Sequence, residues 1–353
     1  MAMKTQIEPD FQRLRTALTG GQPDRVPLVE LAVDPAIRAG FLGKPADDLK
    51  SEIEFFARAG YDAIKISPLV DINPGHREPR EAWRTSESLD FNRDRVWAPQ
   101  GAGMITTEEE LDSYRWPQPE EIDYSRFEQA AELLPDGMKI IGQYGDIFTW
   151  AWTLMGFETF CLALVDNPPL AERVMGILGE LIFGMFEVMV AFDEVGALWY
   201  TDDVAFKTGL LVSPRILREH LFPWMRKIGQ LCQKRNIPFM YHSDGKLDAV
   251  MGDLLDCGID ALHPIEPQAM DIRELKKRYG NKLCLIGNLD LEYTLTRGTP
   301  QEVERETRAL IRDVGAGGGY CVGSSNSIPS YVPLENYRAM VETTLRHGWY
   351  PFD

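Results

Sequence analysis

A histidine and an aspartate stand two residues apart in the run Tyr241-His242-Ser243-Asp244-Gly245. Residues two apart in an extended chain point to the same side, so His242 and Asp244 would face one pocket. An imidazole and a carboxylate can bind a divalent cation or work together as an acid–base pair. The spacing therefore predicts a metal site or a His–carboxylate pair. The alternative is a histidine that only hydrogen-bonds a neighbouring loop.

Two adjacent aspartates, Asp202 and Asp203, follow shortly after the apolar run Ala197–Tyr200. We expect one carboxylate to face the pocket, where it binds a cation, orients a substrate or pairs with a base. The other carboxylate would cap the next element or contact a loop. Asp203 is the predicted catalytic residue of the two. The alternative is that both aspartates only cap the next element or are solvated.

A second histidine and carboxylate lie three residues apart in His263-Pro264-Ile265-Glu266-Pro267. The two prolines stiffen this segment and would hold Glu266 at the rim of a pocket. Glu266 is therefore a predicted site residue. His263 is equally well explained as a buried strand residue whose nitrogens are satisfied by the backbone.

The aromatic residues Phe148, Trp150 and Trp152 alternate along the chain after Asp146. Rings placed in this way could line a pocket for a planar apolar substrate, and core packing is the alternative. Cys321 lies inside an apolar run, which favours a packed core thiol over a nucleophile.

Eight short apolar runs, each followed by a stretch with helical periodicity, are the elements that must position these side chains. The alternation predicts parallel strands joined by crossover helices. No Gly-x-Gly-x-x-Gly fingerprint follows the first run, so a closed (β/α)₈ TIM barrel is favoured over an open doubly wound sheet. The predicted strands are Val26–Leu31, Ala63–Ile66, Lys139–Gln143, Ala197–Tyr200, Pro238–Tyr241, Ala261–His263, Leu283–Ile286 and Gly319–Val322.

The loops after the strands of such a barrel build its pocket, so polar residues at the strand ends are the candidate site residues. The predicted substrate-binding residues are Glu30, Lys65, Tyr144, Asp146, Trp150 and Asn288. Asn326, which follows the eighth strand, is a further candidate. We expect one domain over residues 1–353, with an excursion at 71–135 that forms a lid over the mouth and contains a β-hairpin around Val96–Ile105.

Composition limits the class of partner. The chain has 37 Lys and Arg against 54 Asp and Glu, a net charge of −17 that repels nucleic acid. Its five cysteines contain no Cys-x-x-Cys pair, which is typical of a reducing compartment. No uninterrupted apolar run reaches the length of a membrane span, and the first ten residues lack a signal-peptide core. We therefore expect a cytoplasmic protein with no membrane or nucleic-acid partner.

Three segments carry a family resemblance. They are Tyr200-Thr-Asp-Asp through Pro223-Trp-Met-Arg-Lys, Tyr241-His-Ser-Asp-Gly through Asp256-Cys-Gly-Ile-Asp-Ala-Leu-His-Pro-Ile-Glu-Pro, and Gly287-Asn-Leu-Asp with Val332-Pro-Leu-Glu-Asn-Tyr-Arg. With them the chain resembles the uroporphyrinogen decarboxylase superfamily, including its corrinoid-linked methyltransferase branch. The resemblance implies the same barrel fold and a homodimer.

The chain departs from both branches at residues that carry their chemistry. The decarboxylases have a Met-Arg-Gln-Ala-Gly-Arg motif where this chain reads Val29-Glu30-Leu31-Ala32-Val33, and Ser67-Pro68-Leu69 lacks their aspartate. The coenzyme M methyltransferases use a His-x-Cys…Cys zinc site. Here Asp244 replaces the first cysteine, and Asn326 stands near the second cysteine and at the decarboxylases' late histidine.

The resemblance then implies chemistry like that of the ether-demethylating members, in which zinc acts as a Lewis acid on an oxygen. A methyl group would pass from a small donor, such as a methoxylated aromatic compound, to a corrinoid carried by a partner protein. The predicted metal ligands are His242, Asp244 and Glu266, and the predicted catalytic residues are His242, Asp203, Glu266 and Asn326. The alternatives are a uroporphyrinogen decarboxylase-like carboxy-lyase and a barrel that binds a small molecule without turnover.

Overall fold

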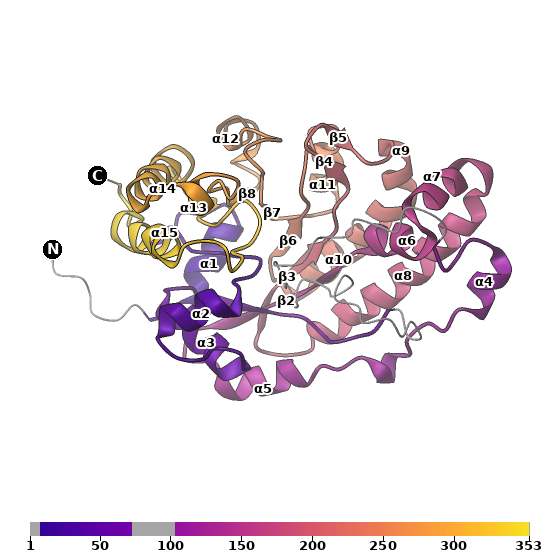
Figure 1. Cartoon of the computed structure of the whole chain (residues 1–353), viewed down its shortest axis with the longest axis horizontal. Helices are drawn as coiled ribbons and strands as arrows, with labels where there is room; N and C mark the ends of the chain where they lie inside the picture. Colours follow the sequence, from indigo (N-terminus) through magenta and orange to yellow (C-terminus); the bar gives the residue numbers. More distant parts are fainter. Residues whose placement is uncertain (1–7, 73–102, 353) are drawn as a thin grey trace.

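The computed structural model describes residues 8–72 and 103–352, and its main element is a curled sheet of seven parallel strands (Figure 1). The strand order is β1-β2-β3-β6-β7-β8-β9. The strands are β1 (Ala63–Ile66), β2 (Lys139–Gly145), β3 (Val195–Thr201), β6 (Phe239–His242), β7 (Ala261–His263), β8 (Cys284–Ile286) and β9 (Tyr320–Cys321). Each lies within two residues of a predicted strand.

The first predicted strand is the exception, because Val26–Leu31 does not form a regular strand. The segment lies beside β9 and makes one isolated parallel bridge, which joins Leu28 to Val322. The Val29 N–H donates to the Val322 carbonyl at 2.9 Å, and the Val322 N–H donates to the Pro27 carbonyl at 2.9 Å. Pro27 has no N–H to donate, which limits any ladder at this position. The fold is therefore the predicted (β/α)₈ barrel, in which the first strand position is occupied by an irregular segment.

Helices lie between successive strands along the chain and cover the outside of the barrel (Figure 1). On the first half of the chain they are α1 (Phe11–Leu18), α2 (Pro35–Leu42), α3 (Leu49–Arg58), α4 (Glu108–Ser113), η1 (Pro119–Glu121), α5 (Ser125–Leu133), α6 (Ile147–Met155), α7 (Phe157–Asp166) and α8 (Pro168–Met189). On the second half they are α9 (Pro214–Ile216), η2 (Leu217–Leu221), α10 (Phe222–Arg235), α11 (Met251–Asp256), α12 (Ile272–Tyr279), α13 (Thr294–Arg297), α14 (Pro300–Val314) and α15 (Leu334–His347).

Prolines and capping residues set several helix boundaries. Asn167 and Pro168 separate α7 from α8, because the residue before a proline is disfavoured in a helix. Thr299 makes a full capping box with Glu302 at the start of α14, whereas Ser213 and Asn167 make no capping hydrogen bond through their side chains.

Two apolar layers hold the barrel together. The outer layer packs the strands against the helices. The inner layer fills the barrel, and α1 closes its N-terminal end with Leu14, Ala17 and Leu18. Cys321 is fully buried in this inner layer with its Sγ 3.9 Å from that of Cys284, so it is a core thiol as predicted. The opposite end of the interior is polar: Ser67 donates to the Gln143 side chain at 2.5 Å, and Gln143 donates to the Thr201 hydroxyl at 2.7 Å.

The described part of the excursion, residues 103–135, contains α4, η1 and α5. The Arg126 guanidinium on α5 contacts Glu52 on α3 at 2.9 Å. At the other end, the Gly103 N–H donates to the Met155 carbonyl at 2.8 Å, which places this point of the chain beside α6. Most of the predicted hairpin around Val96–Ile105 lies outside the described residues, and the lid stays a prediction.

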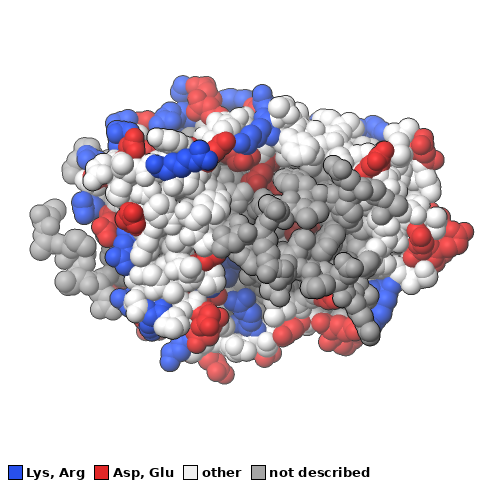
Figure 2. All heavy atoms as spheres, in the orientation of Figure 1, with Lys and Arg blue, Asp and Glu red and all other residues white. Residues whose placement is uncertain are grey.

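No single helix in residues 8–72 and 103–352 is long and apolar enough to span a membrane. The pair α6 and α7 passes the same test by length and composition with a bend of 98°, and the α6 side chains are mostly buried in the protein. On the face drawn in Figure 2, basic and acidic side chains are intermixed. This face therefore presents no continuous basic patch among its described residues.

Candidate functional site

Three ligand-type side chains converge at the C-terminal ends of β3 and β6. The Nε2 atom of His242 lies 3.6 Å from Asp203 Oδ1 and 3.9 Å from Asp244 Oδ1. One atom from each of the three residues falls within 4.8 Å of the others, a spacing that can hold a metal ion. The strand register explains the arrangement: Thr201 pairs with His242, so Asp203 and Asp244 each lie two residues beyond a paired position. We call these three residues the mouth cluster.

The two adjacent aspartates divide their roles in the way the sequence predicts. Asp202 accepts hydrogen bonds from the Phe148 N–H at 2.7 Å, the Thr149 N–H at 3.0 Å and the Tyr200 hydroxyl at 2.6 Å. Asp202 therefore accepts hydrogen bonds from N–H groups at the start of α6 that have no partner within the helix. Burial raises the pKa of Asp202 to about 6, against the lowering effect of these hydrogen bonds. Asp203 is left to face His242.

Glu266, a predicted metal ligand, is not part of the mouth cluster. Its carboxylate accepts the Gly245 N–H at 2.7 Å, and burial raises its pKa. Gly245 has a φ of 84°, and a Cβ there would lie 2.5 Å from the Ala205 carbonyl of the hairpin β4 (Ala205–Phe206) and β5 (Gly209–Leu210). Glu266 thus holds the loop that carries Asp244, and Asp203 takes the place predicted for Glu266.

His263 is a site residue that sequence reasoning left as structural. It is fully buried at the end of β7, and its Nδ1 lies 2.8 Å from the Nδ1 of His242. The structural alternative assumed a backbone partner for His263, and the partner is the side chain of His242. Burial, and then His242, lower the pKa of His263 well below its usual value, so it is neutral. The role of His263 could have been predicted only from the pairing of His242 with His263 between β6 and β7, which the sequence alone does not show.

Asn326, the candidate after the eighth strand, contacts the mouth cluster through Asp244. Its side-chain N–H donates to Asp244 Oδ2 at 2.7 Å, and the Ser327 hydroxyl donates to its carbonyl oxygen at 2.8 Å. These bonds fix the orientation of the amide, so Asn326 holds one oxygen of Asp244 while the other faces His242.

Glu30, Lys65 and Asp146 lie near the polar end of the barrel. Glu30 accepts the Ser324 N–H at 2.8 Å and the Ser324 hydroxyl at 2.6 Å, and burial raises its pKa to about 8. Lys65 and Glu30 line the same small cavity of about 10 Å³. Asp146 adopts a left-handed φ of 71° directly after β2. Burial, followed by the charges of Asp202 and Asp203, raises the pKa of Asp146 well above its usual range.

Three other predicted substrate-binding residues occupy different environments from those expected. Tyr144 belongs to the outer layer, because Gln143 takes the inward position in the alternation of β2. Trp150 lies on helix α6, where residues two apart differ by about 200°, so it does not share a face with Phe148. Asn288 donates to the Ile265 carbonyl at 2.8 Å and so supports the loop of Glu266.

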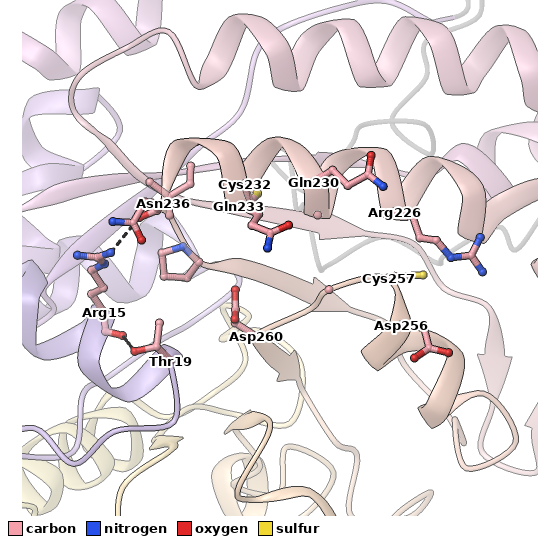
Figure 3. A pocket seen from close by; sticks show the side chains of 14 residues that line it. Arg15, Thr19, Arg226, Gln230, Cys232, Gln233, Asn236, Asp256, Cys257 and Asp260 are labelled. Atoms are coloured by element: carbon pink, nitrogen blue, oxygen red, sulfur yellow. Dashed lines mark hydrogen bonds between the residues drawn. The ribbon is translucent and has the colours of Figure 1, made fainter.

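A cavity of about 540 Å³ lies at the opposite end of the strands, between α1, α10 and the starts of β6 and β7. Figure 3 shows Arg15 at one end of it, Arg226 at the other and Asp260 between them. The Arg15 guanidinium donates to the Asn236 carbonyl, and Asp260 accepts the N–H of Phe239. Its charged groups are thus partly engaged by the backbone, and the mouth cluster remains the better candidate for chemistry.

Comparison with known proteins finds similarity to decarboxylases and methyltransferases of one family. The family model for uroporphyrinogen decarboxylase (URO-D) matches residues 81–347. A methylcobamide:CoM methyltransferase of Methanosarcina barkeri is 28% identical over 209 residues, 59% of this chain and 58% of that protein. A uroporphyrinogen decarboxylase of Methylobacillus flagellatus is 34% identical over 73 residues, 21% of this chain and 20% of that protein. Each alignment thus spans less than two thirds of the relative.

A solved structure shares the fold over nearly the whole chain. It is a methyltransferase from Methanosarcina mazei, with a TM-score of 0.66, 20% sequence identity, and coverage of 94% of this chain and 97% of that one. At this identity the likeness establishes the barrel and not the reaction. Together with the family match over residues 81–347, it places this chain in the uroporphyrinogen decarboxylase family.

Proposed function

We propose that this protein is a methyltransferase that moves a methyl group from a small donor, such as a methoxylated aromatic compound, to a corrinoid held by a partner protein. The observation that carries the proposal is the mouth cluster of Asp203, His242 and Asp244. Its members come from the strand ends where barrel enzymes build their sites. The similarity to methyltransferases that act on a methylcobamide supports the choice of reaction class.

The donor atoms of the mouth cluster fit a zinc ion. Zinc in catalytic sites takes three protein ligands from histidine, carboxylate and thiolate groups, and it keeps one position for the reactant. Asn326 and His263 contact two of these ligands from behind, as outer partners of metal ligands do. Bound there, zinc would supply Lewis-acid polarisation of a donor oxygen. The oxygen-rich set favours this chemistry over activation of a thiol.

The proposed reaction breaks the C–O bond of the donor and forms a Co–C bond. The electron pair of Co(I) attacks the methyl carbon, and the C–O bonding pair leaves with the donor oxygen, which takes up a proton. We infer that Asp146, which directly follows β2 at the same end of the barrel, supplies that proton; burial, and then the charges of Asp202 and Asp203, raise its pKa. The products are a methylated corrinoid and a demethylated alcohol or phenol.

A corrinoid protein would have to cover the barrel mouth. Three large side chains on the segments that follow β3, β8 and β9 are about half exposed: Phe206 at 48%, Tyr293 at 55% and Tyr331 at 54%. Exposed aromatic residues of this kind are enriched where protein partners bind. We infer that these rim aromatics contact the corrinoid protein.

The test of the proposal is methyl transfer from a panel of phenyl methyl ethers and methylated amines to free cob(I)alamin, followed by the absorbance of methylcobalamin. We expect transfer from at least one donor and loss of transfer in Asp203→Asn. The matched control is Asp256→Asn, which changes an exposed aspartate at the far cavity and should transfer methyl groups at the wild-type rate. No transfer from any donor would contradict the proposal.

A carboxy-lyase is the second candidate, and the local similarity to a uroporphyrinogen decarboxylase favours it. The same protein sample is incubated with uroporphyrinogen, and the products are separated by chromatography. Rapid formation of coproporphyrinogen, together with no methyl transfer, would replace the first proposal by the second.

A further inference from the structure

The two nitrogens of His242 serve different neighbours. Nε2 faces the carboxylates of Asp203 and Asp244 at 3.6 and 3.9 Å, whereas Nδ1 lies 2.8 Å from the Nδ1 of His263. The rings of the two histidines are 5.0 Å apart, and His263 is fully buried. The second histidine is therefore positioned to act on the mouth cluster only through the first.

Two Nδ1 atoms at this distance share a single proton, so one nitrogen donates and the other accepts. If His263 donated, a neutral His242 would carry its own proton on Nε2 and would have no lone pair for a cation. If His263 accepts, His242 carries the proton on Nδ1, and its Nε2 lone pair faces the two carboxylates. Only the second arrangement makes His242 a metal ligand.

The surroundings of His263 hold it in place for this role. Its ring packs edge to face against Trp199, with centroids 5.1 Å apart and an angle of 84° between the planes. Trp199 belongs to the apolar inner layer. Within the described residues, the Nε2 of His263 has no hydrogen-bond partner. His263 then carries its own proton on Nε2 in a pocket shared with the Trp199 ring, where an N–H···π contact is a weak interaction that proteins do use.

We propose that His263 is a positioning residue that accepts the Nδ1 proton of His242 and so directs the His242 Nε2 lone pair toward a divalent cation bound by Asp203 and Asp244. This inference rests on the metal-assisted chemistry proposed above. It assigns to His263 a role in cation binding and none in direct contact with the substrate.

The first test is zinc affinity, measured by competition with a chelating dye on the full chain. His263→Phe keeps a ring against Trp199 and removes both nitrogens, and we expect zinc affinity to fall roughly 10–100-fold, as for other outer partners of metal ligands. His263→Asn restores an acceptor close to Nδ1 and should recover most of the loss. Trp199→Phe is the matched control, because it disturbs the same packing without removing the Nδ1 contact, and it should bind zinc like the wild type.

The second test is ¹⁵N NMR of histidine-labelled protein, in which five histidines contribute. With zinc bound, we expect His242 to be protonated at Nδ1 and bound to the metal through Nε2. Zinc binding by His263→Phe at wild-type affinity, coordination through Nδ1, or no zinc binding by the wild type would each overturn the inference.

These outcomes separate this inference from the proposed function. If zinc binding depends on His263 but no donor is demethylated, the inference stands and the methyltransferase proposal falls. If the wild type transfers methyl groups but binds no zinc, the proposal of methyl transfer stands and the role of His263 falls.

Discussion

The two ends of the barrel differ in how their charged side chains are arranged. At the N-terminal end, opposite charges touch: Arg13 lies 2.6 Å from both Asp24 and Asp62, and Arg25 lies 3.5 Å from Asp62. At the C-terminal end, the carboxylates of Asp203 and Asp244 gather around one imidazole at 3.6 to 3.9 Å, beside the acidic Asp146 and Asp202.

This contrast separates structure from chemistry. In a buried pair of a carboxylate and a guanidinium the two charges compensate each other, and losing one member leaves the other charge buried. Carboxylates held together at a pocket favour a bound cation. We therefore expect changes at the N-terminal end to alter the free energy of unfolding, and changes at the mouth to alter metal affinity and turnover.

The largest effect on activity is expected for His242→Ala. Loss of the imidazole removes a ligand from the mouth cluster, so zinc affinity and methyl transfer should fall by more than the roughly 10–100-fold typical of an outer partner. Calorimetric zinc titration and the cob(I)alamin assay measure the two quantities. A variant that keeps wild-type turnover would show that the chemistry lies elsewhere.

The largest effect on stability is expected for Asp62→Asn at the N-terminal end. Asp62 is fully buried between Arg13 and Arg25, and breaking such a pair costs about 3–5 kcal/mol in the free energy of unfolding. Urea denaturation measures the change, with Asp203→Asn as the comparison at the mouth. The contrast fails if Asp203→Asn destabilises the protein more than Asp62→Asn does.

A third prediction concerns pH. Burial raises the pKa of Glu30 from 4.5 to about 8. Because the folded state holds the proton more tightly, Glu30 contributes stability that is fully present below pH 4.5 and is lost as the pH rises to about 8. Glu30→Gln should flatten the fall in unfolding free energy over this range, measured by urea denaturation at a series of pH values. An unchanged slope would assign the pH dependence to other groups.

The smallest effect is expected at the rim. Tyr331→Ser removes one exposed ring from the surface proposed to meet the corrinoid protein. We expect a few-fold higher KM for the protein-bound corrinoid, since most interface residues contribute little, and an unchanged rate with free cobalamin. Steady-state kinetics with both acceptors decide the matter. An equal loss with both would place Tyr331 in the site itself.

Local patterns predicted much of the fold. The bounds of Ala63–Ile66 and Ala261–His263 agree with the observed strands, because each is a short apolar run ended by turn residues. The prediction of a regular first strand was wrong, because the pairing of this segment depends on Pro27 and on a partner almost 300 residues away. Periodicity reports the local conformation of a segment and not its distant partners.

Candidate site residues could be predicted when they lie on the same strand end, and not when they are brought together from several strands. His242 and Asp244 follow from their spacing on one strand end. The preference for Asp203 over Glu266 depends on the register between β3 and β6, and the contact of His263 with His242 depends on the register between β6 and β7. The prediction for Trp150 assumed an extended chain, whereas the segment is the helix α6.

The most direct test of the mouth cluster as a cation site is a zinc titration of metal-free protein, with methyl transfer to cob(I)alamin measured at each step. We predict that transfer rises in proportion to bound zinc and levels off at about one ion per chain, as expected for a single three-ligand site. Asp203→Asn should abolish this rise. Full transfer without metal, or one bound zinc with no gain in transfer, would contradict the account.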